Sequence, residues 1–194
     1  MGVVVVVATM SLDGFIARPD DSVGPLFDWM GNGDVEVVAG DEQRPFRTTQ
    51  ASADWIRESW GRAGAQLCGR HLFDYTNGWA GRPPNGDHVV VVTHAAPTDW
   101  PFPDAPFSFV TTGVADAVAR AKELAGDRDV GVAAGDVGGQ VLAAGLTDEV
   151  EISLVPVVLG AGKRFFGDAA ELLLDDPYLT VAGDRVTHMR YRTR

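Results

Sequence analysis

A glycine-rich segment at residues 130–166 carries the clearest chemical signal in this sequence. It begins VGVAAGDVGGQ and continues through an apolar run to LGAGKRFF, a pattern that predicts a strand, a glycine turn, a short helix and a second strand. Gly135, Gly138 and Gly139 stand where the first strand meets the helix. A helix N-terminus offers unpaired N–H groups and partial positive charge, and glycine lets a ligand approach the backbone. The segment therefore indicates a site for the phosphates of a nucleotide or dinucleotide.

Two aspartates are the candidate acidic groups. Asp13 lies in SLDG, directly after the first apolar run, and a loop at the carboxyl end of a central strand is where open α/β sheets bind ligands. Asp13 could orient a substrate or relay a proton, or it could cap the loop backbone while Gly14 takes a positive φ. Asp28 precedes Trp29; this pair could anchor a flat heterocycle, although a core position suits Trp29 better. Other aromatic side chains could line the same cleft or pack in the core: Phe15, Phe73, Tyr75 and Trp79.

Two further segments suit an anionic ligand. GRHLFD at residues 69–74 is a strand-to-helix junction, where Gly69, Arg70 and His71 could hold a phosphate or simply form an exposed helix start. Thr93 and His94 end another apolar run. They would suit a 2′-phosphate at the same sheet edge, or they form a turn that ends the strand.

The elements that position these residues follow from periodicity and turn signals. We expect strands at residues 3–8, 65–68, 88–93, 107–111, 130–134 and 149–159. We expect helices at residues 49–63, 114–125 and 137–144, a helical turn at 25–30, a helix beginning at Gly69, and loops at 9–24, 31–48 and 95–106. The last third predicts strands at 171–174, 178–182 and 185–192. This order indicates a mixed sheet that is parallel in its middle and antiparallel at one edge.

Composition narrows the class of protein. The chain has 194 residues, 45% hydrophobic and 22% charged, which suits one globular domain over residues 1–194. The net charge of −11 argues against nucleic-acid binding, which needs a basic face. Apolar runs of strand length and no signal peptide predict a cytoplasmic protein without a membrane span. Cys68 is the single cysteine and the four histidines are widely spaced, so we expect no disulfide and no metal site.

Taken together, these segments resemble the dihydrofolate reductase-like superfamily, in the branch of the riboflavin biosynthesis reductase (RibD C-terminal-like) domain. The resemblance rests on SLDGFIA at 11–17, GRHLFD at 69–74, GDVGGQ at 135–140, AGLTDEVEISLVPVVLGAG at 144–162 and the RFF that follows. It implies a three-layer α/β/α fold with a mixed central sheet and a C-terminal antiparallel hairpin. It also implies an NADPH-dependent reductase that transfers a hydride to a small heterocycle, either a dihydrofolate-like pterin or a 5-amino-6-(5-phosphoribosylamino)uracil-like pyrimidine.

The resemblance also implies roles for individual residues. The nicotinamide would meet Ala8, Gly14, Phe15 and Ile16, and the phosphates would meet Gly69, Arg70, His71 and Leu72. Thr93 and His94 would meet the adenosine 2′-phosphate, and the diphosphate would lie against Gly135, Asp136, Val137, Gly138, Gly139 and Gln140. Asp13 would organise the loop near the nicotinamide, while Asp28, with Trp29, Phe73 and Tyr75, would contact the substrate.

Two departures from the family pattern leave a second function open. Many relatives have Thr or Ser where this chain has Leu72, and Asp136 stands where a second glycine is usual. A non-catalytic NADP-binding or interaction protein that keeps the fold is the alternative to a reductase. The zinc deaminase elements that accompany many riboflavin reductases are absent from the sequence. We also expect a homodimer, because residues 149–159 and the terminal hairpin offer strand edges that need covering.

Overall fold

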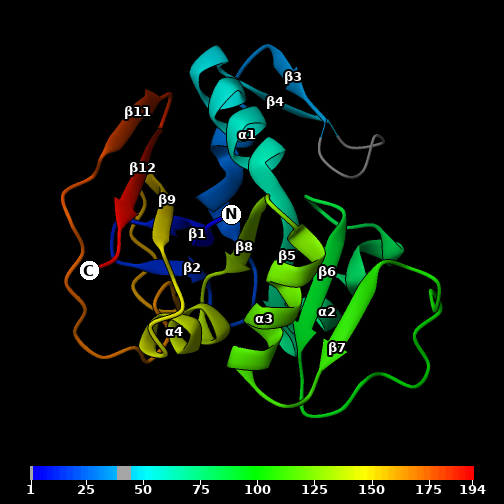
Figure 1. Ribbon diagram of the computed structural model, residues 1–194. Helices are drawn as coiled ribbons and strands as arrows, with labels where there is room; N and C mark the ends of the chain where they lie inside the picture. Colours follow the sequence, from blue (N-terminus) through cyan, green and yellow to red (C-terminus); the bar gives the residue numbers. More distant parts are fainter. Residues whose placement is uncertain (1, 39–44) are drawn as a thin grey trace.

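The computed structural model describes residues 2–38 and 45–194 (Figure 1). Its centre is an eight-stranded sheet in the order β11-β12-β9-β1-β8-β5-β6-β7. These strands are β1 (Val4–Ser11), β5 (Ala63–Gly69), β6 (His88–Val92), β7 (Phe107–Val110), β8 (Asp129–Ala133), β9 (Glu149–Val155), β11 (Leu179–Gly183) and β12 (Val186–Arg192). Strands β9, β1, β8, β5, β6 and β7 pair in parallel, whereas β12 pairs antiparallel with both β9 and β11. The predicted mixed sheet with a C-terminal antiparallel hairpin is confirmed.

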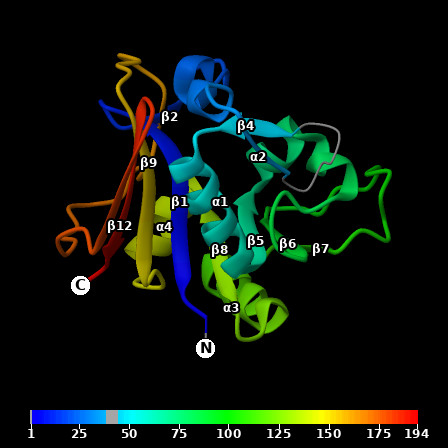
Figure 2. The same ribbon diagram turned by 90° about the horizontal axis from the view of Figure 1, so that it is seen from above.

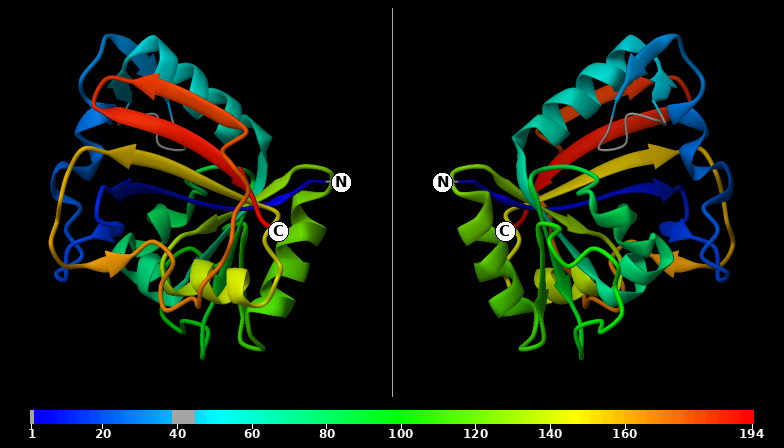
Figure 3. Two further views of the ribbon diagram at one scale, coloured as in Figure 1. Left: turned by 90° about the vertical axis from the view of Figure 1, so that its left-hand side faces the viewer. Right: turned by 90° about the vertical axis from the view of Figure 1, so that its right-hand side faces the viewer.

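Helices cover both faces of this sheet and make three layers (Figures 2 and 3). On one face lie α1 (Gln50–Arg62) and the short α2 (Arg70–Tyr75), and on the other lie α3 (Val114–Ala125) and α4 (Asp136–Ala143). The predicted threonine cap of α1 is confirmed, since the Thr49 side chain accepts a hydrogen bond from the backbone N–H of Ser52. The 3₁₀ turns η1 (Gly24–Met30) and η2 (Asn77–Gly81) complete the helical elements.

The two faces of the sheet differ in chemistry. Because side chains alternate along a strand, Val4 and Val6 of β1 and Val150 of β9 point toward α3 and α4, where they join the largest apolar core. On the opposite face, β9 and β12 carry buried polar side chains at every second position: Glu151, Ser153, His188 and Arg190. The α3–α4 side therefore holds the largest apolar core, whereas the α1 side combines smaller apolar clusters with buried polar groups.

Several segments differ from the sequence-based expectation. Strand β1 continues to Ser11, and β2 (Phe15–Ala17) lies in the expected loop at 9–24, where it pairs with β10 (Lys163–Arg164). Strand β9 ends at Val155 instead of residue 159, because Pro156 has no N–H to continue the ladder. Residues 171–174 do not form a strand and make only an isolated bridge from Leu174 to Thr193.

The expected loop at 31–48 holds the short strands β3 (Val35–Val37) and β4 (Phe46–Thr48), which pair with each other. Residues 39–44 of that loop lie outside the described residues, and so does any role of that part in covering a site. Among the residues that are described, no helix is long and apolar enough to cross a membrane.

The glycines of α4 have a packing role. A Cβ built at Gly139 would lie 2.3 Å from the carbonyl oxygen of Phe166, and one at Gly138 would lie 3.0 Å from the carbonyl oxygen of Ala133. Both glycines are buried. They let α4 approach β8 and the segment that follows β10. The absence of a side chain at these two positions therefore serves packing of the fold.

We expect Gly139→Ala to destabilise the protein by about 2 kcal/mol, because the added methyl group would overlap a backbone oxygen that cannot move freely. Gly61→Ala is the matched control, because a Cβ there meets nothing within 4 Å and alanine favours the helix by up to about 1 kcal/mol. Urea unfolding of both variants measures the difference. Equal free energies of unfolding would contradict the packing role.

Candidate functional site

A cavity of about 590 Å³ opens between α1 and the carboxyl-terminal halves of strands β1, β5, β8 and β9. This is where open α/β sheets bind ligands, and the volume suits a small organic molecule. One part of the wall comes from the strand ends and the start of α4: Ala8, Ile16, Gly69, Ala133, Ala134, Gly135, Asp136 and Val137. The other part comes from η1, α1 and the polar face of the sheet: Trp29, Met30, Trp55, Ile56, Ser59, Trp60, Gln66, Glu151 and Ser153.

The first part of the wall fits an extended phosphate-bearing ligand. Helix α4 begins after Gly135 with no side chain capping its first turn, so its first N–H groups have no intrahelical partner. Gly135 has a φ of 101° and donates its own N–H to the carbonyl oxygen of Phe165 at 2.8 Å. A Cβ at Gly69 would lie 2.9 Å from Val137. Small residues thus keep this wall low enough for a ligand to reach the backbone.

Two basic side chains border the same part of the cavity. His71 Nε2 lies 2.9 Å from Asp21 Oδ1, and Lys163 Nζ lies 3.6 Å from the same oxygen. The hydrogen bond from His71 lowers the pKa of Asp21, and the positive charges act in the same direction. Asp21 therefore joins the loop after β2, the start of α2 and β10 around one edge of the cavity.

The structure brings about half of the sequence-predicted site residues to this cavity. Those that line it are Ala8, Ile16, Trp29, Gly69, His71, Leu72, Tyr75, Gly135, Asp136 and Val137. Those that do not line it are Asp13, Gly14, Phe15, Asp28, Arg70, Phe73, Thr93, His94, Gly138, Gly139 and Gln140. Asp136 is exposed at the first position of α4, where a carboxylate is favourable to the helix dipole.

Asp13 organises a loop. Its carboxylate accepts hydrogen bonds from Ser11 Oγ at 2.6 Å and from the backbone N–H groups of Leu159 and Gly160 at 3.1 and 2.7 Å. The hydrogen bond from Ser11 is the main cause of the lowered pKa of Asp13. The loop after β1 is thereby tied to the loop after β9. The side chain of Asp28, by contrast, is exposed on η1.

Arg70 and Thr93 lie together just beyond the cavity. The Arg70 Nη1 and the Thr93 hydroxyl both donate to the carbonyl oxygen of Ala95, at 2.9 and 2.8 Å. Arg70 Nε also donates to Asp74 at 2.7 Å. The strand ends of β5 and β6 thus place a guanidinium and a hydroxyl side by side, as the two sequence segments predicted.

Phe73 packs in an aromatic core instead of the cavity wall. Its ring centroid lies 5.2 Å from those of Trp100 and Phe109, and the side chain is buried beneath α2. Its place on the inner side of a six-residue helix explains this, because Leu72 and Tyr75 take the cavity side.

Sequence analysis missed the polar floor of the cavity. Glu151 is 4% exposed and holds two partners, since Ser59 Oγ donates to Oε1 at 2.6 Å and Arg190 Nε donates to Oε2 at 2.7 Å. Arg190 is also paired with Glu58 of α1. The available signal was the alternation of Glu149, Glu151 and Ser153 within an otherwise apolar strand.

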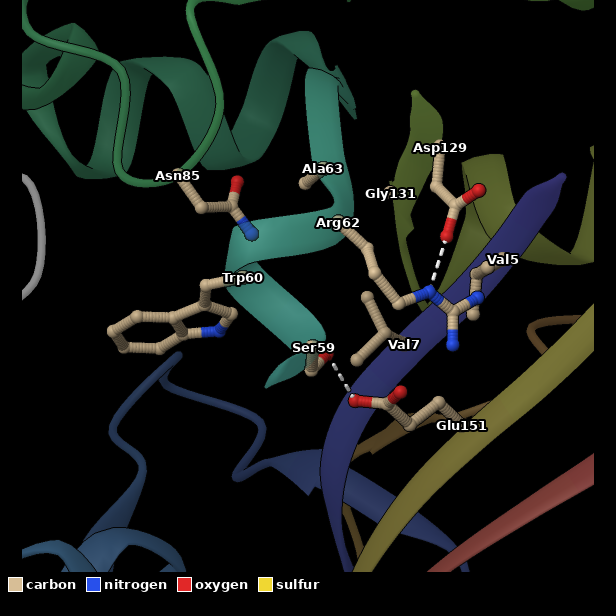
Figure 4. A pocket seen from close by; sticks show the side chains of 10 residues that line it. All are labelled: Val5, Val7, Ser59, Trp60, Arg62, Ala63, Asn85, Asp129, Gly131 and Glu151. Atoms are coloured by element: carbon tan, nitrogen blue, oxygen red, sulfur yellow. Dashed lines mark hydrogen bonds and ion pairs between the residues drawn. The ribbon is translucent and has the colours of Figure 1, made fainter. Parts of the chain in front are cut away.

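A second, smaller cavity of about 30 Å³ lies beside the first and shares Val7, Ser59, Trp60 and Glu151 with it (Figure 4). Arg62 closes one side, with Nε donating to Asp129 at 2.6 Å. Asn85 reaches in from the opposite side, and its Oδ1 is buried with no hydrogen-bond partner among the described residues. This space is large enough for one water molecule among polar groups.

His188 lies beneath the tryptophans of the cavity wall. Its ring is fully buried, with Ser52 Oγ 3.0 Å from Nε2 and Ser153 Oγ 2.9 Å from Nδ1. Trp55 stacks on the ring at 4.9 Å, and Trp29 meets it edge-on at 5.0 Å. Burial lowers the pKa of His188 to about 4, so the ring is neutral at pH 7.

An open α/β sheet with a cavity at its strand ends is the arrangement in which proteins of this architecture bind small molecules. The family model of the RibD C-terminal domain matches residues 3–186, and the chain belongs to that family. A comparison with curated protein sequences found no match.

Solved structures share the fold at low identity. A candidate riboflavin biosynthesis protein from Shewanella sp. PV-4 is 19% identical, with a TM-score of 0.75 and coverage of 99% of both chains. A pyrimidine reductase-like protein from Corynebacterium diphtheriae is 13% identical, with a TM-score of 0.64 over all of this chain and 92% of the other.

A diaminohydroxyphosphoribosylaminopyrimidine deaminase/5-amino-6-(5-phosphoribosylamino)uracil reductase from Thermotoga maritima is 15% identical, with a TM-score of 0.62. That match covers all of this chain but only 57% of the Thermotoga chain. At these identities the structures establish the fold.

We expect His188 to make the free energy of unfolding depend on pH. The folded pKa of about 4 lies below the value of 6.5 expected for an exposed histidine. The contribution is therefore complete above pH 6.5 and is lost as the pH falls toward 4, by on the order of 3 kcal/mol. Urea unfolding of the native chain and of His188→Gln between pH 7 and 4.5 measures the difference. A difference that stays constant across this range would disprove the assignment.

Proposed function

We propose that this protein is an NADPH-dependent reductase that transfers a hydride to a small heterocycle. The observation that carries the proposal is the cavity itself, which joins a glycine-edged wall with an uncapped helix start to a chamber of tryptophans and polar side chains. Membership of the RibD C-terminal family and the reductases among the structural neighbours support the same reaction class.

The glycine-edged wall would hold the cofactor. Gly69 and Gly135 leave room beside the backbone, and the first N–H groups of α4 would meet the diphosphate. Lys163 adds positive charge at the edge of this wall, and His71 adds a hydrogen-bonding group. Arg70 and Thr93, which share the carbonyl of Ala95, would meet the 2′-phosphate. When bound, NADPH supplies the hydride. Ala8 and Ile16 would lie against the nicotinamide side, with Asp13 holding their loop in place.

The chamber of tryptophans would hold the heterocycle and exclude water from it. Trp29, Trp55 and Trp60 supply apolar surface, while Ser59, Gln66 and Glu151 supply hydrogen-bonding groups. Asp28 has no part in this arrangement, because its side chain is exposed outside the cavity.

The first test compares NADPH and NADH binding by fluorescence titration. We expect NADPH to bind more tightly, and Arg70→Gln to weaken NADPH about tenfold while leaving NADH unchanged, since the lost contact is to the 2′-phosphate alone. Arg120→Gln, which alters an exposed arginine paired with Glu123 on α3, is the matched control. Equal loss for both nucleotides would remove Arg70 from the 2′-phosphate site.

Turnover separates the reductase from a protein that only binds NADP. Dihydrofolate or a 5-aminouracil derivative is added to the NADPH complex and the absorbance of the reduced nicotinamide is followed. Oxidation that depends on the added acceptor supports the reductase. Tight binding without oxidation by any acceptor would favour the non-catalytic alternative.

A homodimer belongs to the same proposal. Strand β9 is not the edge expected from the sequence, since β12 and β1 cover it on both sides. The outer strand at this end of the sheet is β11, and exposed Leu173 and Tyr178 lie in the segment that leads into it. A free edge beside apolar side chains needs covering.

Light scattering should therefore give twice the 20.7 kDa mass of one chain. Leu173→Arg should reduce that mass to the monomer, because it places a charge in the covered surface. Leu12→Arg, at another exposed leucine, should leave it unchanged. A monomeric mass for the native chain at working concentration would remove this part of the proposal.

A further inference from the structure

The tryptophan-lined part of the cavity carries a polar side chain that no protein group satisfies. Gln66 is 8% exposed and lines the cavity, and its side-chain amide has no hydrogen-bond partner among the described residues. The indole Nε1 of Trp29 also lacks a partner in the described part of the chain, but that atom is enclosed by protein. An amide that borders a cavity without a protein partner is available to a ligand with a polar edge.

The carboxylate of Glu151 lines the same space and can accept further hydrogen bonds. Its two oxygens each hold one protein donor, from Ser59 and Arg190, whereas each carboxylate oxygen can accept two hydrogen bonds. A ring N–H or amino group could therefore add to Glu151, while the Gln66 amide offers both a donor and an acceptor.

Positive charge is missing from this part of the cavity. Among residues 2–38 and 45–194, Lys163 is the one lysine or arginine that lines the larger cavity, and it is paired with Asp21. Arg190 lies behind the floor, 3% exposed, and is committed to Glu151 and Glu58. Arg62 lines only the smaller cavity, where Asp129 and Glu149 hold it.

A phosphate group would be unfavourable here. A dianion would lose its hydration without gaining a cation, and it would lie near the carboxylate of Glu151. The basic side chains on the cavity wall, His71 and Lys163, both contact Asp21 on the part of the wall that we assign to the cofactor.

We propose that the substrate is a flat, uncharged heteroaromatic compound without a phosphate, bound through Gln66 and Glu151. This inference rests on the proposed reductase function, because only an enzyme has a substrate. It narrows that function, because the Thermotoga relative is described as a reductase of a phosphoribosyl compound, whereas the part of the cavity around Gln66 and Glu151 offers no free cation to a phosphate.

Isothermal titration with matched probes tests the inference. The probes are 5-aminouridine, its 5′-monophosphate and unsubstituted pterin, each with and without saturating NADP⁺. We expect 5-aminouridine or pterin to bind at least tenfold more tightly than the monophosphate. Tighter or equal binding of the monophosphate would overturn the inference, as would a failure of both unphosphorylated rings to bind.

Variants of the polar floor test the residues. Gln66→Leu should weaken the ring that binds about tenfold, while Gln50→Leu, at an exposed glutamine paired with Asp54, should have no effect. Gln66→Met provides a second variant if the leucine variant does not fold. Unchanged affinity in a folded Gln66 variant would remove Gln66 from the ring site.

The two proposals can fail separately. Ring binding that favours the unphosphorylated probes, without any binding or oxidation of NADPH, would disprove the reductase function and leave the ring site standing. Oxidation of NADPH by the monophosphate alone would support the reductase and overturn the ring preference.

Discussion

The buried ion pair between Arg190 and Glu151 is the interaction on which the site depends. It lies on neighbouring antiparallel strands, and Glu58 extends it to α1. The same guanidinium lies 4.5 Å from the ring centroid of Trp55. Removing one member of such a pair leaves an uncompensated buried charge, which costs about 3–5 kcal/mol. The pair therefore fixes the distance between α1 and the sheet, and with it the height of the cavity.

The ion pairs between α1 and the sheet explain how this helix can cover the sheet and still leave a cavity beneath it. The N-terminal half of α1 packs through Ala53 and Ile56 into an apolar cluster with Val155 and Val186. Its C-terminal half is held instead by hydrogen-bonded charges, with Arg62 reaching Asp129 of β8. Charged side chains are long and directional, so they can span a gap that apolar packing would close.

On the opposite face of the sheet, α4 packs closely against the strands. Helix α4 needs Gly138 and Gly139 to approach backbone oxygens within van der Waals distance, and its Val141 joins the main apolar core. The glycine-rich segment at residues 135–139 thus has two structural roles. Gly135 borders the cavity, whereas the two glycines that follow serve packing. One run of sequence supplies both a ligand-facing edge and a core contact.

The order of strands and helices could be predicted from the sequence, because periodicity, caps and turn residues act within a few positions of one another. Thr49 at the start of α1 and the strand before Gly135 are such local signals. Local signals also located the cavity edge at Gly69 and Gly135. Pro156 is another local signal, and it ends β9 before the apolar run ends because it has no N–H for the ladder.

The sequence by itself determined the family, the mixed sheet and the glycine-rich turn before α4, since each depends on signals within contiguous segments. Only the tertiary structure decided which polar side chains share the cavity. Glu151 is far along the chain from Ser59 and Gln66, and their meeting depends on strand register and on the side of the sheet that α1 covers. The same holds for Asp13, whose role was settled by backbone donors at Leu159 and Gly160. A one-residue shift in register would turn each floor residue to the other face, and no local pattern specifies that register.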